Sequence, residues 1–209
     1  MTTLVYAFYQ QGSSDGILDI VNRSTDKGVK VTGIQQVARL MVKEGKFDEA
    51  QAWLETLPKE LTFRGFEQLV EVGAEHDPER WVNYVQRFEN KHERQQLVNW
   101  VLVRLIEKNP ADGARIFSKL APDQQVGGAM TLVNHWYPTD PKAVKTWAET
   151  VGNQHVKDTV FRYLVFQLAK TSRDEAIAMA QRIQNPELRE SALRANLIFV
   201  SNVAAPADR

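Results

Sequence analysis

Histidine and cysteine are the residues most often used for catalysis and metal binding, and in this sequence they form no motif. The 209 residues include no cysteine, which removes disulfides, thiolate metal sites and a cysteine nucleophile. The four histidines fall in different predicted helical hairpins, so none of them pairs at the spacing of a metal site. They are His76, His92, His135 and His155. We expect no metal site and no cofactor.

Neighbouring carboxylates could serve in acid–base catalysis, but their positions favour a structural role. Asp48–Glu49 and Asp174–Glu175 fall in the first turn of predicted helices, where the helix dipole favours negative charge. The pair Gly127–Gly128 is interpreted as permitting close helix packing rather than as a phosphate loop. No Walker-type glycine loop, GxSxG elbow, HExxH pair or dinucleotide fingerprint occurs. We therefore predict that the chain is not an enzyme.

The charge balance argues against a nucleic-acid partner. Lysine plus arginine and aspartate plus glutamate number 26 each, whereas a phosphate-binding protein usually has a basic excess. The 43% hydrophobic content can form a sizeable core, and the N-terminus has no apolar run long enough for a signal peptide or a membrane span. We expect a soluble cytoplasmic protein without membrane insertion. A periplasmic location, or origin as a piece of a larger protein, is the alternative.

The strongest pattern is an internal repeat of 31 or 32 residues. Four predicted helices begin with a residue whose side chain can cap the helix, and in three of them proline follows. These caps are Asp77, Asn109, Asp140 and Ser172. Three columns of apolar or small residues recur at the same spacing on these helices, called B helices here. The columns are Leu57, Phe88, Leu120, Val151 and Ile183; Trp53, Tyr84, Ile116, Trp147 and Met179; and Ala50, Trp81, Gly113, Val144 and Ala176.

Each B helix is preceded by another predicted helix, called an A helix, with its own apolar columns. The first column is Leu69, Val101, Leu132 and Leu164, and the second is Phe66, Val98, Ala129 and Phe161. The predicted A helices are Gly33–Glu44, Thr62–Glu75, Glu93–Lys108, Gln124–Tyr137 and Gln154–Lys170, and a last helix, Pro186–Val200, could cap the stack. Nothing reads as a strand, because β-branched residues are dispersed and no run alternates with period two.

The first hairpin resembles a tetratricopeptide repeat. In that family a small residue sits in helix A, a glycine ends it, and an aromatic-Asp-Glu-Ala run opens helix B. The matching residues are Ala38, Gly45, Phe47, Ala50 and, near the close of the unit, Pro58. The resemblance extends from about Gly33 to Asn185, although the later hairpins lack the inter-helix glycine and place Trp81 or Val144 where the family has alanine.

We therefore predict an all-α fold, a right-handed α-solenoid of about five to six antiparallel helix hairpins of 31–32 residues. A single hairpin buries too little apolar area to fold alone, so neighbouring hairpins must stack. Residues 1–32 are predicted as a degenerate helical hairpin, Leu4–Gln11 with Asp15–Asn22, followed by a polar loop over Arg23–Thr32. Residues 33–200 are the solenoid, and residues 201–209 a flexible tail.

The resemblance implies a concave surface, lined by the A helices, that holds an extended peptide or a partner helix. Positions of the A helices outside the core columns mix cations, amides and aromatics, which suits peptide recognition. These candidate partner-binding residues are Arg39, Lys43, Arg64, Trp100, Arg104, Asn134, His135, Tyr163 and Gln167. Of these, Trp100 and Tyr163 are expected to be partly buried between hairpins.

The sequence thus predicts a protein–protein interaction module that binds a peptide or a partner protein. Two other functions stay open. The chain could be a helical accessory domain of a larger enzyme or of a bacterial envelope complex, or, less in keeping with its charge, a nucleic-acid-binding helical repeat. Neither the identity of the partner nor the oligomeric state follows from the sequence.

Overall fold

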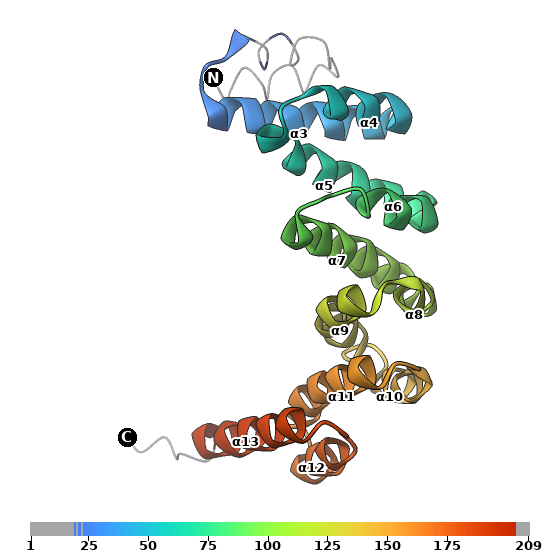
Figure 1. Ribbon diagram of the computed structural model, residues 1–209, viewed down its shortest axis with the longest axis vertical. Coiled ribbons are helices and arrows are strands. Elements are labelled where there is room, and N and C mark those ends of the chain that lie inside the picture. The colour runs from blue at the N-terminus through green and yellow to red at the C-terminus, as the bar shows by residue number, and fades with distance from the viewer. Residues whose placement is uncertain (1–18, 20, 22, 204–209) are drawn as a thin grey trace. The chain divides into compact units, whose positions relative to one another are not determined.

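The computed structural model describes residues 19, 21 and 23–203, with side chains for all of these except 60 and 195–203. In this part of the chain every regular element is an α-helix, which confirms the all-α prediction (Figure 1). The described helices are α3 (Lys27–Lys43), α4 (Phe47–Thr56), α5 (Lys59–His76), α6 (Pro78–Val85), α7 (Lys91–Lys108), α8 (Pro110–Lys119), α9 (Pro122–Trp136), α10 (Pro141–Thr150), α11 (Gln154–Leu168), α12 (Arg173–Gln181) and α13 (Pro186–Val203).

Long and short helices alternate along the chain. The odd-numbered A helices have 15 to 18 residues and the even-numbered B helices have 8 to 10. Contacts divide the chain into two compact units, Met1–Val101 and Leu102–Arg209. In the first unit α3 packs on α4 and α5, and α5 packs on α6. In the second unit α9 packs on α8, α10 and α11, while α11 also packs on α12 and α13. Helices adjacent in sequence are therefore mostly adjacent in space.

All four predicted N-caps are confirmed. The side chains of Asp77, Asp140 and Ser172 each accept a hydrogen bond from the backbone N–H three residues later, at 3.0, 2.8 and 3.3 Å. Asn109 accepts one from the N–H of Ala111 at 3.2 Å. Each cap satisfies a donor that the first helical turn leaves without an intrahelical partner.

The apolar columns of the A helices form the centre of the core within each unit. Every residue of the Leu69 column is 0% exposed, and the Phe66 column is at most 5% exposed. The B-helix column that contains Trp81 and Val144 is buried throughout. The Leu57 column is mixed: Leu57, Phe88 and Val151 are half-buried, whereas Leu120 and Ile183 are buried.

One predicted loop is wrong. The polar loop over Arg23–Thr32 ends early, since α3 begins at Lys27 rather than Gly33. Asp26 supplies the missed start signal, because its carboxylate accepts from the N–H of Val29 at 3.0 Å. The predicted segment Leu4–Gln11 lies outside the described residues, and of Asp15–Asn22 only residues 19 and 21 are described, both helical. The last helix runs three residues into the predicted tail, and the remainder of that tail also lies outside the described residues.

The glycine expected to end the first A helix does so. Gly45 has φ 75°, a left-handed conformation that costs a residue with a side chain about 1 kcal/mol or more. This conformation lets the N–H of Lys46 bond to the carbonyl of Met41 at 2.8 Å, which satisfies a carbonyl of the last turn. Because α3 stops there, the chain can turn and start α4 at Phe47.

Candidate functional site

Core packing decides which faces of α9 and α11 point outward. Leu132 and Val133 on α9 and Leu164 and Val165 on α11 are all 0% exposed, so these sides of the two helices lie in the core. Side chains one or two positions before or after these residues point away from the core and are exposed or half-buried. The two helices pack on each other, so their outward residues form one surface of the second unit.

The predicted partner-binding residues reach solvent to different degrees. On α3 and α5, Arg39, Lys43 and Arg64 are exposed, and on α9, Asn134 and His135 are exposed. Arg104, Tyr163 and Gln167 are half-buried. Trp100, expected to be partly buried between hairpins, is instead 38% exposed on α7, and Tyr163 meets that expectation.

Two of the predicted residues are brought into direct contact. The side-chain amide of Gln167 donates to the side-chain oxygen of Asn134 at 2.5 Å, which links α11 to α9. Lys170 donates to the other end of the same Gln167 amide at 2.9 Å. Arg64 and Arg104 instead bind carboxylates of their own helices, Glu67 at 2.8 Å and Glu107 at 3.0 Å. The Asn134–Gln167 bond therefore connects two members of the set on α9 and α11.

The same surface contains three residues that the sequence reasoning missed. Met130 on α9 is 46% exposed and Phe166 on α11 is 38% exposed, high values for large hydrophobic side chains. The ring of Phe166 lies 6.3 Å from that of Tyr163, and the guanidinium of Arg162 lies 5.1 Å from the Tyr163 ring centre. We call this surface the α9–α11 face: Met130, Asn134, Arg162, Tyr163, Phe166 and Gln167.

The repeat itself could have led to these residues. Phe166 occupies the position in α11 that Asn134 occupies in α9, and Asn134 was already a candidate. Met130 and Arg162 likewise share one repeat position, directly before the position of Tyr163. Treating every large apolar residue at helical spacing as core hid this pattern, because only the exposed fraction separates Phe166 from Val165.

Arg162 has hydrogen-bonding capacity left over. Its Nη2 atom bonds to the hydroxyl oxygen of Tyr163 at 3.2 Å, while its Nε atom is buried without an acceptor among the described residues. Within the described part of the chain no carboxylate lies within ion-pair distance of its guanidinium. The one carboxylate of α11, Asp158, is 2% exposed and engaged elsewhere. The α9–α11 face thus combines apolar side chains with a cation that has no anionic partner among the described residues.

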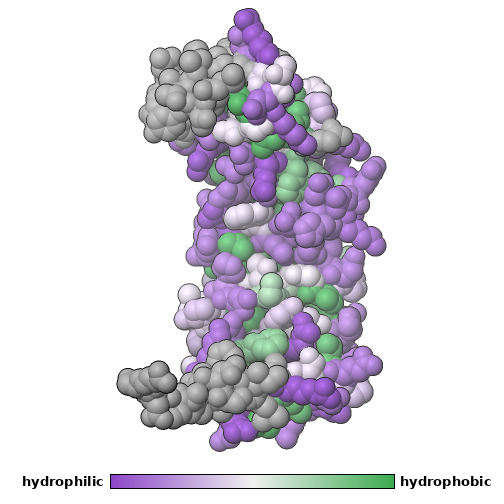
Figure 2. Space-filling model, turned by 90° about the vertical axis from the view of Figure 1, so that its left-hand side faces the viewer, coloured by the Kyte–Doolittle hydropathy of each residue, from purple (hydrophilic) through white to green (hydrophobic). Residues whose placement is uncertain are grey.

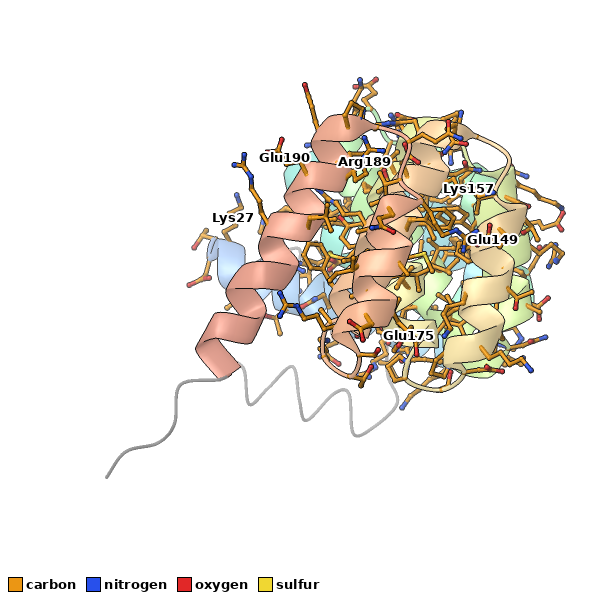
Figure 3. All side chains as sticks on the ribbon, turned by 90° about the horizontal axis from the view of Figure 1, so that it is seen from below. Lys27, Glu149, Lys157, Glu175, Arg189 and Glu190 are labelled. Atoms are coloured by element: carbon orange, nitrogen blue, oxygen red, sulfur yellow. The ribbon has the colours of Figure 1, made fainter. Side chains whose placement is uncertain are left out.

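The B helices present a different surface, on which charges are matched between neighbouring hairpins. In the first unit Arg80 bonds to Asp48, and Arg87 lies 3.5 Å from Glu55. In the second unit Lys145 lies 3.1 Å from Glu175. Glu149 there meets Arg182 at 2.5 Å and Lys157 at 3.8 Å, and Figure 3 shows Glu149 and Lys157 on adjacent segments. Four of these pairs join residues 30 to 33 positions apart, whereas Lys157 follows Glu149 by eight, so several charges on this surface are paired between neighbouring hairpins.

A buried carboxylate that sequence reasoning did not single out holds the start of α13. Asp158 accepts hydrogen bonds from the backbone N–H groups of Gln184 and Asn185 at 3.0 and 2.8 Å, and from the side chain of Gln154 at 2.7 Å. All of these are charge-assisted, so they compensate the cost of burying the ion. Asp158 therefore positions the turn between α12 and α13 and takes no part in a surface site.

The other features noted in the sequence have structural roles. His76 is the last residue of α5 and packs edge-on against Phe47 at 5.7 Å, and His155 lies in the first turn of α11. A Cβ atom at Gly128 would lie 2.8 Å from Leu102, which confirms the predicted close packing there. Over residues with described side chains, no three histidine or acidic groups gather as a metal site would require.

The surface in Figure 2 is largely hydrophilic, with hydrophobic side chains in separate spots between charged ones. None of the described helices is both long and apolar enough to span a bilayer. Comparison of the chain with protein-family models, with curated proteins and with solved structures found no match. Functional inference therefore depends on the geometry of the chain itself.

Proposed function

We propose that the helix pairs stack as tetratricopeptide-like repeats in a right-handed α-solenoid, and that the A-helix surface binds a peptide or partner protein. Support for the stack comes from contacts between hairpins within each unit. Asp48 with Arg80, Glu55 with Arg87, and Asn134 with Gln167 are 32 or 33 residues apart in sequence. In each pair the second residue lies one position beyond the repeat equivalent of the first, so neighbouring hairpins touch with the same offset, as stacking with a constant register requires.

The α9–α11 face is the observation that carries the binding proposal. Methionine, tyrosine, phenylalanine and arginine are enriched in interface cores, and all four occur on the α9–α11 face. Met130, Tyr163 and Phe166 supply the apolar and aromatic area. The Asn134–Gln167 bond holds the two helices in register beneath a ligand. The B-helix surface offers a partner less, because several of its charges are already paired between hairpins.

The chemistry of the face defines the partner. Apolar side chains of an extended peptide or an amphipathic helix would cover Met130 and Phe166, which are 46% and 38% exposed. A carboxylate or carbonyl oxygen of the partner would accept from the half-buried guanidinium of Arg162, which among the described residues bonds to the Tyr163 hydroxyl and to no carboxylate. Because a hydrogen bond from a guanidinium to a carboxylate is charge-assisted and directional, it would give the complex orientation as well as affinity.

Affinity capture with matched variants tests the proposal. Wild-type protein, Phe166→Ser and Arg162→Glu are immobilised and exposed to extract from the source cell, and the recovered proteins are quantified. Lys145→Glu is the control, because it reverses a cation of similar exposure that belongs to the paired B-helix surface. We expect Phe166→Ser and Arg162→Glu to lose proteins that the wild type and Lys145→Glu retain.

The folded state of each variant is checked by circular dichroism before capture. If all four proteins recover the same set in the same amounts, the α9–α11 face is not the binding surface. If Lys145→Glu alone loses the recovered proteins, binding belongs to the B helices, and the assignment of the A-helix surface is wrong.

A further inference from the structure

The first unit contains a hollow of about 330 Å³ that the proposed partner surface does not use. It lies where the end of α4 meets the start of α5 and where the end of α6 meets the start of α7. Four aromatic residues line it: Phe63, Phe66, Tyr84 and Phe88. Hollows of about this size that combine apolar walls with polar groups are the usual form of small-ligand sites. Here six apolar or aromatic residues share the lining with seven polar or charged ones.

The aromatic wall is ordered by ring-to-ring contacts. Phe66 and Phe88 meet edge-to-face with centroids 5.2 Å apart, and Tyr84 lies 5.6 Å from Phe66 and 6.1 Å from Phe88. Phe66 is only 5% exposed, so the core holds the base of the wall in place. Phe63 and Phe88 are half-buried and border the hollow. A further ring entering here would continue the same edge-to-face pattern.

Charged groups at the rim are already matched with one another. Arg87 lies 3.5 Å from Glu55, and Lys59 lies 3.6 Å from Glu89 across the two loops. The Tyr84 hydroxyl donates to Glu55 at 3.0 Å. Burial, and then the charge of Glu55, raise the Tyr84 pKa well above its usual value, so this hydroxyl stays neutral.

Glu93 is the remaining charged residue of the lining, and its position in a helix favours a negatively charged side chain. It lies in the first turn of α7, where the helix dipole favours a carboxylate. Nearby, Arg94 donates to the carbonyl of Phe88 at 2.9 Å, which satisfies the backbone at this edge. An anionic ligand would therefore lose water without gaining an ion pair, because Arg87 and Lys59 already pair with Glu55 and Glu89, whereas Glu93 would repel it. An uncharged ring would lose little.

We propose that this hollow binds the uncharged aromatic group of a ligand, separately from any partner on the α9–α11 face. The walls supply ring contacts, the carboxylates of the lining disfavour an anionic ligand, and the volume accommodates a single ring with a short substituent. A free aromatic molecule and an aromatic side chain of a peptide share this chemistry.

Three probes of nearly equal shape test the charge requirement. They are 2-phenylethanol, which is neutral, protonated phenethylamine and 3-phenylpropionate, each titrated into the full chain and followed by NMR chemical shifts. For so small a ligand we expect a Kd of about 1 mM for 2-phenylethanol. 3-Phenylpropionate should bind at least about fivefold more weakly, because its carboxylate meets the carboxylates of the lining. Phenethylamine, which meets the same carboxylates with the opposite charge, should bind more tightly than 3-phenylpropionate. Binding of 3-phenylpropionate as tight as that of the alcohol overturns the proposal.

Substitution within the wall locates the binding. Phe88→Ala and Phe63→Ala each remove a half-buried ring that borders the hollow, and each should weaken binding of 2-phenylethanol about five- to tenfold. Phe47→Ala is the control, because Phe47 is also half-buried in the first unit but contacts His76 and Trp81 outside the hollow. Unchanged binding in both wall variants, with well-dispersed spectra, overturns the proposal.

A fourth probe separates the two sources of the ring. N-acetyl-phenylalaninamide carries the same ring on a peptide backbone, which must pass the Lys59–Glu89 pair at the rim. Binding at least as tight as that of 2-phenylethanol identifies a peptide side chain as the ligand. Weaker binding identifies a free aromatic molecule. If neither probe binds at a concentration 20-fold higher than about 1 mM, the hollow is not a ligand site.

Discussion

Replacing Gly73 by alanine tests how closely α5 and α6 pack. A Cβ atom at Gly73 would overlap the indole of Trp81, with Cζ2 at 2.6 Å and two other ring atoms closer still. Carbon atoms in contact prefer about 3.5–4.0 Å, so the ring must move. Trp81 is 2% exposed and lies between Tyr84 at 5.6 Å and Phe47 at 6.4 Å, so it has little room to do so.

The magnitude follows from two opposing effects. Overpacking a well-filled core costs about 1–3 kcal/mol, and the confined indole places this site at the upper end. Alanine in place of glycine within a helix recovers about 1 kcal/mol. We therefore expect Gly73→Ala to lower the free energy of unfolding by about 2 kcal/mol. Urea unfolding followed by tryptophan fluorescence and by circular dichroism measures the loss, with coincidence of the two signals as the check on two-state behaviour.

Gly152→Ala is the matched control, because no atom lies within 4 Å of a Cβ built at Gly152. Its stability should change by less than about 0.5 kcal/mol or rise slightly. A second check is the double variant: in the background of Trp81→Leu, which removes the indole, Gly73→Ala should cost much less. A Gly73→Ala protein as stable as the wild type, or an equal cost in both backgrounds, would refute this account of the α5–α6 contact.

Two further outcomes follow from buried polar groups. Asp158→Asn turns an amide NH₂ group toward one of the two backbone N–H groups from which the carboxylate now accepts hydrogen bonds. It should lower the free energy of unfolding by about 2 kcal/mol and speed amide hydrogen exchange in α13. The control, Asp123→Asn at an exposed position, should change neither quantity. The Tyr84 pKa is raised in the folded state. The contribution of the neutral Tyr84 hydroxyl to the free energy of unfolding is therefore complete below about pH 10, and it is lost as the pH rises from there toward the folded pKa. Alkaline unfolding of Tyr84→Phe should therefore depend less steeply on pH than that of the wild type, and an unchanged slope would contradict the assignment.

Helix starts and core columns could be predicted because local physics determines them. An Asp, Asn or Ser side chain can cap a helix wherever it lies just before one, so the positions of Asp77 and Ser172 sufficed. The Leu69 column was found because its members recur at helical spacing in each A helix, and all are fully buried. The same reasoning missed the cap at Asp26, since Ser24, Asp26 and Lys27 together resemble a polar loop.

The candidate site was less predictable because it depends on tertiary contacts. Asn134 and Gln167 were selected as outward positions, but only packing of α11 on α9 shows that they bond. Phe166 and Val165 are both apolar and adjacent, yet one is 38% exposed and the other fully buried. Asp158 was not singled out, because its bonding partners lie 26 and 27 residues away. A sequence period locates a face of a helix, but burial determines which of its residues a partner can reach.

The two surfaces of the helix pairs differ in what they require of the sequence. Exposed ion pairs such as Lys145–Glu175 are typically worth about 0.2–1 kcal/mol, so on the B helices they favour one register more than they stabilise the fold. Stability comes mainly from the buried columns, which must stay apolar in every repeat. Outward positions of the A helices are under neither constraint, and their identities do change, from Trp100 to Thr131 to Tyr163 at one repeat position. If the hairpins do stack in order, each would present a different side chain to a ligand at the same repeat position. A partner lying along the A helices would then be recognised one hairpin at a time, through residues that the core leaves free to vary.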